Sequence, residues 1–538
     1  MNGNFLKQLF NRRTSSFIIF LVALITIVSL IPLSRLHVDF NPAQLLKKND
    51  PDKATYDQFK TQFNASSEEQ NIFIALKNRR GIFQKDFLVK ADSLTRFLLR
   101  HPKVLRVYSL TSTTLIYFNG EDVNARPLLH VNQPEFYKED SIYLFESNEY
   151  RDLLVSARGD CIAIGAFNDT SLTHQEKEQL LQSIEAKIKE LNFDESHLIS
   201  RIQFEKASMQ KGKRLLSLCF FGLLIVIVIG YLLLHRSVKE IMINLAVILT
   251  TLLWSLALIS LFGSSLNFLT LLLQVFLLLV VSISLIFIGN INLRNTTITT
   301  GWTAGRRIIS SAIIILLTAI SVYFISQKKI DSHLANAVSR SMASDLKYMD
   351  QNFYGSRPFE MVLRIKNNQP GFYDTAMMHK VEDIQNYLRD SLRVGALISP
   401  NSLFKGANKA FHGGSSNYFR IPDSAHHIQR FAEAIMQTEY ADELQRYMVA
   451  DGSSIRISGR LEDVGTEQFH ILSEKLQKFY ARNYSQHFSY QITGTAVIYD
   501  KISVFLVKIL AIAFILAIGI YILFVLIFGQ TGRNKNHF

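Results

Sequence analysis

The chain has 538 residues, of which 48% are hydrophobic and 19% charged, and its formal net charge is +13. A soluble protein of this length usually carries more charge, and the apolar residues gather in long runs, as in membrane proteins. The Lys and Arg residues are dispersed, which argues against nucleic-acid binding. Only two cysteines, Cys161 and Cys219, are present, so no disulfide framework is expected.

Six apolar runs are long enough for a membrane-spanning helix, which needs about 20 residues. They predict spans at residues 15–33, 214–234, 241–262, 266–289, 308–325 and 502–528. The first run is longer than the apolar core of a signal peptide and lacks a small-residue cleavage site, so it is expected to be retained.

Basic residues in the short segments between these runs predict the orientation of the chain. The positive-inside rule places the N-terminus (1–14), the linker 290–307 and the tail 529–538 in the cytoplasm. Residues 34–213 and 327–501 are then outside. We therefore expect a multi-pass protein of the bacterial inner membrane, with both termini cytoplasmic and both large domains periplasmic.

Both outside segments alternate strand-like and helix-like patterns. In the first segment, Asn71–Lys77, Lys103–Tyr108, Cys161–Phe167 and Leu198–Phe204 read as strands, and Asp86–Arg100 and Glu176–Leu191 read as helices. This order suits a ferredoxin-like split βαβ domain. The predicted fold class is a bundle of six transmembrane helices with two extracytoplasmic α+β domains.

An internal repeat relates the two halves of the chain. Gly159-Asp-Cys-Ile-Ala-Ile164 matches Gly452-Ser-Ser-Ile-Arg-Ile457, and Tyr56-Asp-Gln-Phe59 matches the segment Tyr348 to Phe353. The matched pairs lie at nearly constant spacing, whereas chance matches would scatter. Two copies of a helix, an outside domain and a helix are thus expected, and parallel repeats of this kind occur in transporters.

Several stretches resemble the resistance–nodulation–division (RND) superfamily, and most closely its MMPL-type members. They are Val38–Leu46 with Tyr56–Phe63 after the first span, His101–Thr111, His235-Arg-Ser237, Asn401–Asn408 and Arg420-Ile-Pro422. The resemblance covers nearly the whole chain and implies export of lipids or other hydrophobic compounds. Family members normally have twelve spans, and a protein partner is one candidate source of the missing spans.

The family's proton-relay residue has no acidic counterpart in this chain. The resemblance places that position near Ser282 and Ser284, and serine does not ionise at physiological pH. Both hydroxyls are expected to support helix packing. Apart from Arg214 at the edge of the second predicted span, Lys508 is the one charged side chain in the six predicted spans, and it either snorkels to the membrane surface or forms a functional ion pair.

The sequence gives no sign of a catalytic, cofactor or metal site. His426 and His427 are adjacent, so on a helix they point apart, and the Gly413–Ser416 turn lacks the Lys-Ser/Thr of a phosphate loop. The expected function is transport of lipid-like or hydrophobic cargo without a proton relay of its own. The alternative is a non-pumping accessory or scaffold subunit of an envelope lipid-export system, and a membrane-bound enzyme is a third, unsupported reading.

Overall fold

The computed structural model describes two compact units. One comprises Met1–Leu45, Met209–Lys329 and Ile502–Phe538, and the other Leu46–Ser208 and Ile330–Lys501. The described residues are 12–34, 50–65, 71–119, 122–146, 149–150, 153–169, 171–204, 206–207, 238–262, 304–327, 338–366, 369–437 and 441–528, with Asp331, His333 and scattered residues between 210 and 285.

The described residues of the first unit include the helices α2 (Arg12–Leu33), α8 (Val238–Leu261), α10 (Ala304–Gln327) and most of α17 (Thr495–Phe528). Helices α2 and α8 pack together, with the Trp254 Nε1 donating to Thr26 Oγ1 at 3.1 Å and Ser260 Oγ donating to the Pro32 carbonyl at 2.5 Å. Many large apolar side chains on these helices are exposed, which is typical of helices that face lipid.

The predicted bundle of six spans is wrong. Among the described residues, two helices are long and apolar enough to cross a membrane, Met242–Leu261 and Thr495–Ile520. Ile19–Leu33 and Ile315–Gln327 are apolar helices of only 10–17 residues within the predicted spans 15–33 and 308–325 and just beyond them. The predicted spans 214–234 and 266–289 lie mostly outside the described residues. The two longer helices indicate membrane association.

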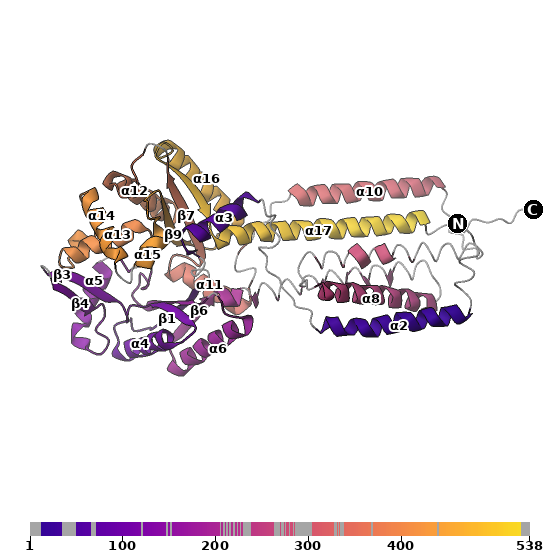
Figure 1. The fold of residues 1–538 in the computed structure, drawn as a ribbon, viewed down its shortest axis with the longest axis horizontal. Helices are drawn as coiled ribbons and strands as arrows, with labels where there is room; N and C mark the ends of the chain where they lie inside the picture. The colour runs from indigo at the N-terminus through magenta and orange to yellow at the C-terminus, as the bar shows by residue number, and fades with distance from the viewer. Residues whose placement is uncertain are drawn as a thin grey trace, which may run out of the picture. The chain divides into compact units, whose positions relative to one another are not determined.

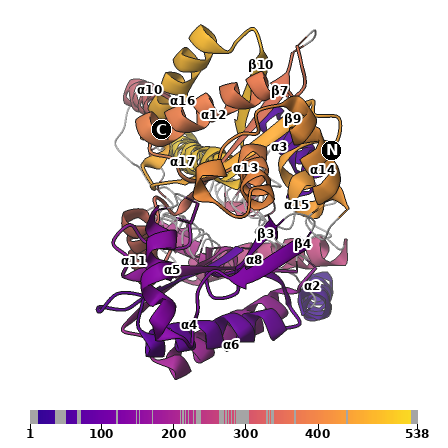
Figure 2. The same cartoon turned by 90° about the vertical axis from the view of Figure 1, so that its left-hand side faces the viewer.

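The second unit contains two four-stranded antiparallel sheets (Figure 1). The first sheet has the order β2-β5-β1-β6 and consists of β1 (Asn71–Lys77), β2 (Val104–Tyr108), β5 (Cys161–Asn168) and β6 (Glu195–Ser200). Helices α4 (Lys85–Arg100) and α6 (His174–Leu191) lie side by side on one face of it in Figures 1 and 2. The strand predicted over Leu198–Phe204 is therefore β6, which begins earlier and ends at Ser200.

The second sheet repeats this arrangement. Its order, read from the matching edge, is β8-β9-β7-β10, with β7 (Arg357–Ile365), β8 (Gly395–Ile398), β9 (Ser454–Leu461) and β10 (Phe488–Thr493). Helices α12 (Thr375–Leu392) and α16 (Gly465–Asn483) follow β7 and β9, as α4 and α6 follow β1 and β5. Both domains are thus two consecutive βαβ units with one connectivity.

Each domain has a different insertion between its second and third sheet strands. The first domain inserts the hairpin β3 (Thr114–Asn119) and β4 (Asp122–Pro127), the turn η3 (Pro134–Phe136) and helix α5 (Tyr137–Glu146). The second domain inserts α13 (Pro400–Phe411), η6 (Ser416–Tyr418), α14 (Ala425–Met436) and α15 (Ala441–Tyr447).

Amphipathic helices explain why the sheets are covered on one face. Helix α4 buries Phe87, Leu88, Ala91, Leu94 and Leu98, the three- and four-residue spacing of a helix face. These side chains pack on the inward residues of β1 and β5. Helix α6 begins with a capping box, in which Thr173 and Glu176 satisfy each other's backbone N–H groups.

Candidate functional site

The two sheet domains exchange helices. Helix α3 (Pro51–Gln62) precedes the first sheet in sequence but contacts β10 of the second, where the Gln491 side-chain amide donates to Thr55 Oγ1 at 2.6 Å. Helix α11 (Arg340–Asn352) precedes the second sheet but contacts β6 of the first. There His197 stacks on Tyr348 with ring centroids 3.7 Å apart. In Figure 2 the indigo α3 lies among the orange strands of the second domain.

The exchanged helices cover unlike sheet faces. On the first sheet, α11 and the residue after it pack on an apolar surface of Phe73, Ala75, Cys161 and Ala163. The edge of the Phe73 ring meets Phe353, with centroids 5.7 Å apart. This face resembles an ordinary protein core.

In the second sheet, the positions equivalent to Ala163 and Phe73 hold an ion pair. Arg456 Nε and Nη2 donate to the two Glu360 carboxylate oxygens at 2.8 and 2.7 Å, and both residues are buried. The Arg456 guanidinium also lies over the rings of Phe59 from α3 and Tyr447 from α15, 5.1 and 5.3 Å from their centroids. A bidentate pair stacked on aromatic rings is among the stronger arginine arrangements.

Arg460, on β9 of the second sheet, contacts the first sheet. Its guanidinium lies 3.7 Å from the centroid of Phe73 on the other sheet. Burial lowers the pKa of Arg460 to about 10, so the side chain stays charged at neutral pH.

Two ion pairs link the domains, and each includes at least one residue of an insertion. Arg106 Nη1 and the Tyr108 hydroxyl both donate to Glu443 Oε1 at 2.6 Å, and Lys409 pairs with Glu149. We call Arg106–Glu443, Lys409–Glu149 and Arg460–Phe73 the charged seam, whereas the Arg456–Glu360 pair lies within the second sheet. A polar, charge-paired seam is typical of domain interfaces that open and close, whereas obligate interfaces are more apolar.

The predicted site residues belong to the first unit, whereas the charged seam belongs to the second. Ser282 is buried and its hydroxyl donates to the Leu278 carbonyl at 2.6 Å, within its own helix. Ser284 lies outside the described residues. Lys508 Nζ donates to the Ser326 carbonyl in the last turn of α10 at 2.9 Å.

Helix α17 starts seven residues before the predicted span and brings two charges that the sequence reading assigned to the outside domain. Asp500 pairs with the fully buried Arg357 of β7. Lys501 Nζ bonds Asp50 Oδ1 at 2.8 Å, and the same Asp50 caps the N-terminus of α3. Asp500 falls within the apolar helix Thr495–Ile520, although its partner belongs to the sheet unit.

The described residues contain no group of three or more His, Cys, Asp or Glu side chains placed to hold a metal ion. Sequence reasoning missed the charged seam and the Arg456–Glu360 pair. The available signal was the alternation of Ile455, Arg456, Ile457 and Arg460, in which charged residues occupy one face of a strand that is otherwise apolar.

No family model and no curated protein matches the chain. Among solved structures, a heavy-metal efflux pump is similar over 80% of this chain, with 8% sequence identity and a TM-score of 0.30. The match covers 50% of that structure, so this chain spans about half its length. The likeness is weak, and nothing about function rests on it.

Proposed function

We propose that this chain is a membrane-attached, RND-like transport protein that moves lipid-like or hydrophobic cargo on the outer side of the bacterial inner membrane. The supporting observation is the duplicated pair of sheet domains with exchanged helices. Each sheet domain follows an apolar helix in the sequence, α2 or α10, and contributes a helix to the other domain. A duplicated, interlocked pair is suited to alternating between closed and open arrangements.

The charged seam supplies the contacts that such a movement would break and remake. Arg106, Glu443, Lys409 and Glu149 have polar heads that water can solvate when the domains part. The cost of opening is then smaller than for an apolar interface of equal area. Cargo would pass along the domains in the open arrangement.

The proposal includes no proton relay within the chain. Met242–Leu261, a described apolar helix, contains no ionisable side chain. Ser282 uses its hydroxyl within its own helix. Energy for uphill movement would therefore come from a partner protein, and the chain alone would support downhill movement.

Reconstitution in vesicles tests this function. Purified protein in vesicles loaded with a fluorescent single-chain lipid should speed transfer of that lipid to acceptor vesicles. Dissipating a proton gradient should leave the rate unchanged. The paired variant Arg106→Gln with Glu443→Gln should alter the rate, whereas Arg100→Gln, an exposed residue at the end of α4, should not. Transfer no faster than in empty vesicles would refute transport by this chain.

A non-pumping accessory role is the second candidate. The lack of ionisable residues in Met242–Leu261 favours it, because a subunit that only holds cargo or a partner needs no coupling group. Deleting the gene and extracting envelope lipids separates the two. Unchanged lipids, together with loss of another envelope complex, would favour the accessory role.

A further inference from the structure

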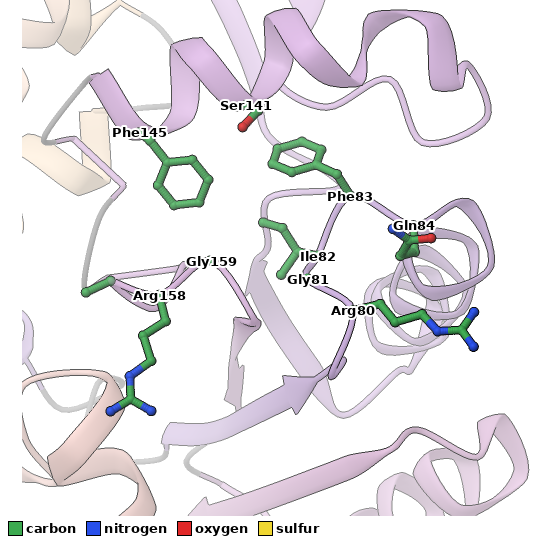
Figure 3. A pocket seen from close by; sticks show the side chains of 10 residues that line it. Arg80, Gly81, Ile82, Phe83, Gln84, Ser141, Phe145, Arg158 and Gly159 are labelled. Carbon is green, nitrogen blue, oxygen red and sulfur yellow. The ribbon is translucent and has the colours of Figure 1, made fainter.

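A hollow of about 510 Å³ opens on the first sheet domain, beside the turn that follows β1 (Figure 3). Its walls include Phe83 from that turn, Ser141 and Phe145 from α5, and Gly159 from the turn before β5. Its volume falls in the range of small-molecule sites, about 300–1,000 Å³.

Two glycine turns form the base of the hollow. Gly81 and Gly159 have φ of +88° and +68°, and the Ile82 N–H donates to the Gly159 carbonyl at 3.0 Å. A Cβ on Gly159 would lie 2.8 Å from the Phe145 ring. The missing side chain therefore lets Phe145 lie directly over the turn.

Aromatic side chains supply the apolar wall. The rings of Phe83 and Phe145 meet edge to face with centroids 6.4 Å apart, and Phe83 also contacts Tyr137. Phe83 and Phe145 are only half-buried, although both pack on the core of the domain. Partly exposed aromatic rings in a concave site offer a surface for an apolar chain.

In the second domain the equivalent glycine turn is covered by a side chain from the turn that follows β7, namely Tyr373. There the Phe372 N–H donates to the Gly452 carbonyl at 2.9 Å, just as Ile82 does to Gly159. The neighbouring Tyr373 covers Gly452, and its hydroxyl donates to the Ala450 carbonyl at 3.1 Å. In the first domain the covering ring comes from α5 instead, so Phe83 is free to line the hollow.

Two arginine side chains lie at the edge of the hollow. Arg80 and Arg158 are exposed, and Figure 3 shows their side chains extending outward from the two glycine turns in different directions. Neither forms a salt bridge with another residue in the described part of the chain. Guanidinium groups on flexible stems can reach a carboxylate or phosphate at the mouth of the hollow.

We propose that this hollow binds the acyl chain of a single-chain anionic amphiphile. The chain would lie against Phe83 and Phe145, and the anionic head would bind the guanidinium of Arg80 or of Arg158 at the mouth of the hollow. This assignment rests on the proposed function, for which it names the cargo class and a cargo site.

Binding of a dansyl-labelled undecanoic acid to the detergent-solubilised full chain tests the site. Ser141→Trp should fill the hollow and abolish the fluorescence increase. Arg80→Glu with Arg158→Glu should weaken binding at least about tenfold, the loss expected for charge-assisted hydrogen bonds. Arg100→Glu, an exposed matched control on α4, should leave the affinity unchanged. The corresponding alcohol should bind more weakly than the acid to the unaltered protein.

The binding experiment tests the proposed site independently of whether the protein transports lipid. Unaltered affinity in Ser141→Trp and in the double arginine variant, with normal thermal unfolding, overturns the site. A probe that binds only when presented in phosphatidylglycerol vesicles, and not as a monomer, overturns the single-chain ligand class. Specific binding in a protein that fails to transfer lipid between vesicles upholds the site and refutes the transport function.

Discussion

Gly159 and Gly452 adopt the same left-handed turn in the two halves of the chain, with φ of +68° and +66°, and each lies beneath an aromatic ring. The ring is Phe145 in the first domain and Tyr373 in the second. Each turn precedes an equivalent strand, β5 or β9, and positions the start of that strand against the rest of its sheet.

Replacing either glycine with alanine should therefore destabilise the protein. The Cβ would meet Phe145 or Tyr373 at under 3 Å, and a positive φ adds about 1–3 kcal/mol of backbone strain. We expect Gly159→Ala and Gly452→Ala each to lower the thermal unfolding temperature. Gly406→Ala is the control, because Gly406 lies on α13 with nothing within 4 Å of the added Cβ. Its unfolding temperature should stay level or rise. Equal falls in all three variants would contradict this account.

The repeat around these glycines was predictable from sequence, because positive-φ turns and alternating strands leave local signals. Helix exchange was not predictable, because the Tyr56 and Tyr348 segments match each other whichever sheet they cover. The charged seam depends on pairs such as Arg106 and Glu443 that are far apart in sequence. The span count rested on apolar composition alone, and among the described residues two helices keep an apolar stretch long enough to cross a membrane.

The buried Arg456–Glu360 pair should be costly to break but replaceable as a unit. Arg456→Met leaves a buried carboxylate without its main cation, which costs about 3–5 kcal/mol. The double variant Arg456→Met with Glu360→Leu should recover most of that loss. The first sheet supports this, since Ala163 and Phe73 occupy the equivalent positions there. Chemical unfolding of the single and double variants measures the coupling.

The exposed pair Arg420–Asp423 provides the control for that cycle. Its side chains are 57% and 78% exposed, and the N–O distance is 3.2 Å. Arg420→Met should hardly change the free energy of unfolding, because water screens surface ion pairs. A double variant at positions 456 and 360 no more stable than Arg456→Met alone would show that the charges themselves are needed.

Cys161 should resist thiol reagents in the folded protein. Burial raises the pKa of the Cys161 thiol to about 12, so almost no thiolate is present at pH 8. In a Cys219→Ser background, where Cys161 is the single cysteine, maleimide should label the native protein slowly and the denatured protein fully. Rapid labelling under native conditions would mean that α11 leaves the first sheet.

His333 should make stability depend on pH above neutrality. Burial lowers its pKa, but the Asp463 carbonyl and the Asp463 and Asp331 carboxylates outweigh that effect and raise the pKa above 6.5. Because the pKa of His333 is higher in the folded protein, the protonated imidazole stabilises the folded state. This contribution is complete below about pH 6.5 and is lost as the pH rises through the folded-state pKa. His333→Gln should flatten the fall in unfolding temperature between pH 6 and 9, and His426→Gln, an exposed control on α14, should not.

Lys508 should stabilise the helices without serving transport. Its ammonium group bonds the Ser326 carbonyl at the C-terminal end of α10, where unpaired carbonyls and the helix dipole favour a cation. Lys508→Met should lower the thermal unfolding temperature slightly and leave lipid transfer between vesicles unchanged. Lys508→Arg should restore the unfolding temperature, since arginine can donate to the same carbonyl. If Lys508→Met unfolds normally but abolishes transfer, Lys508 is a functional charge rather than a helix cap.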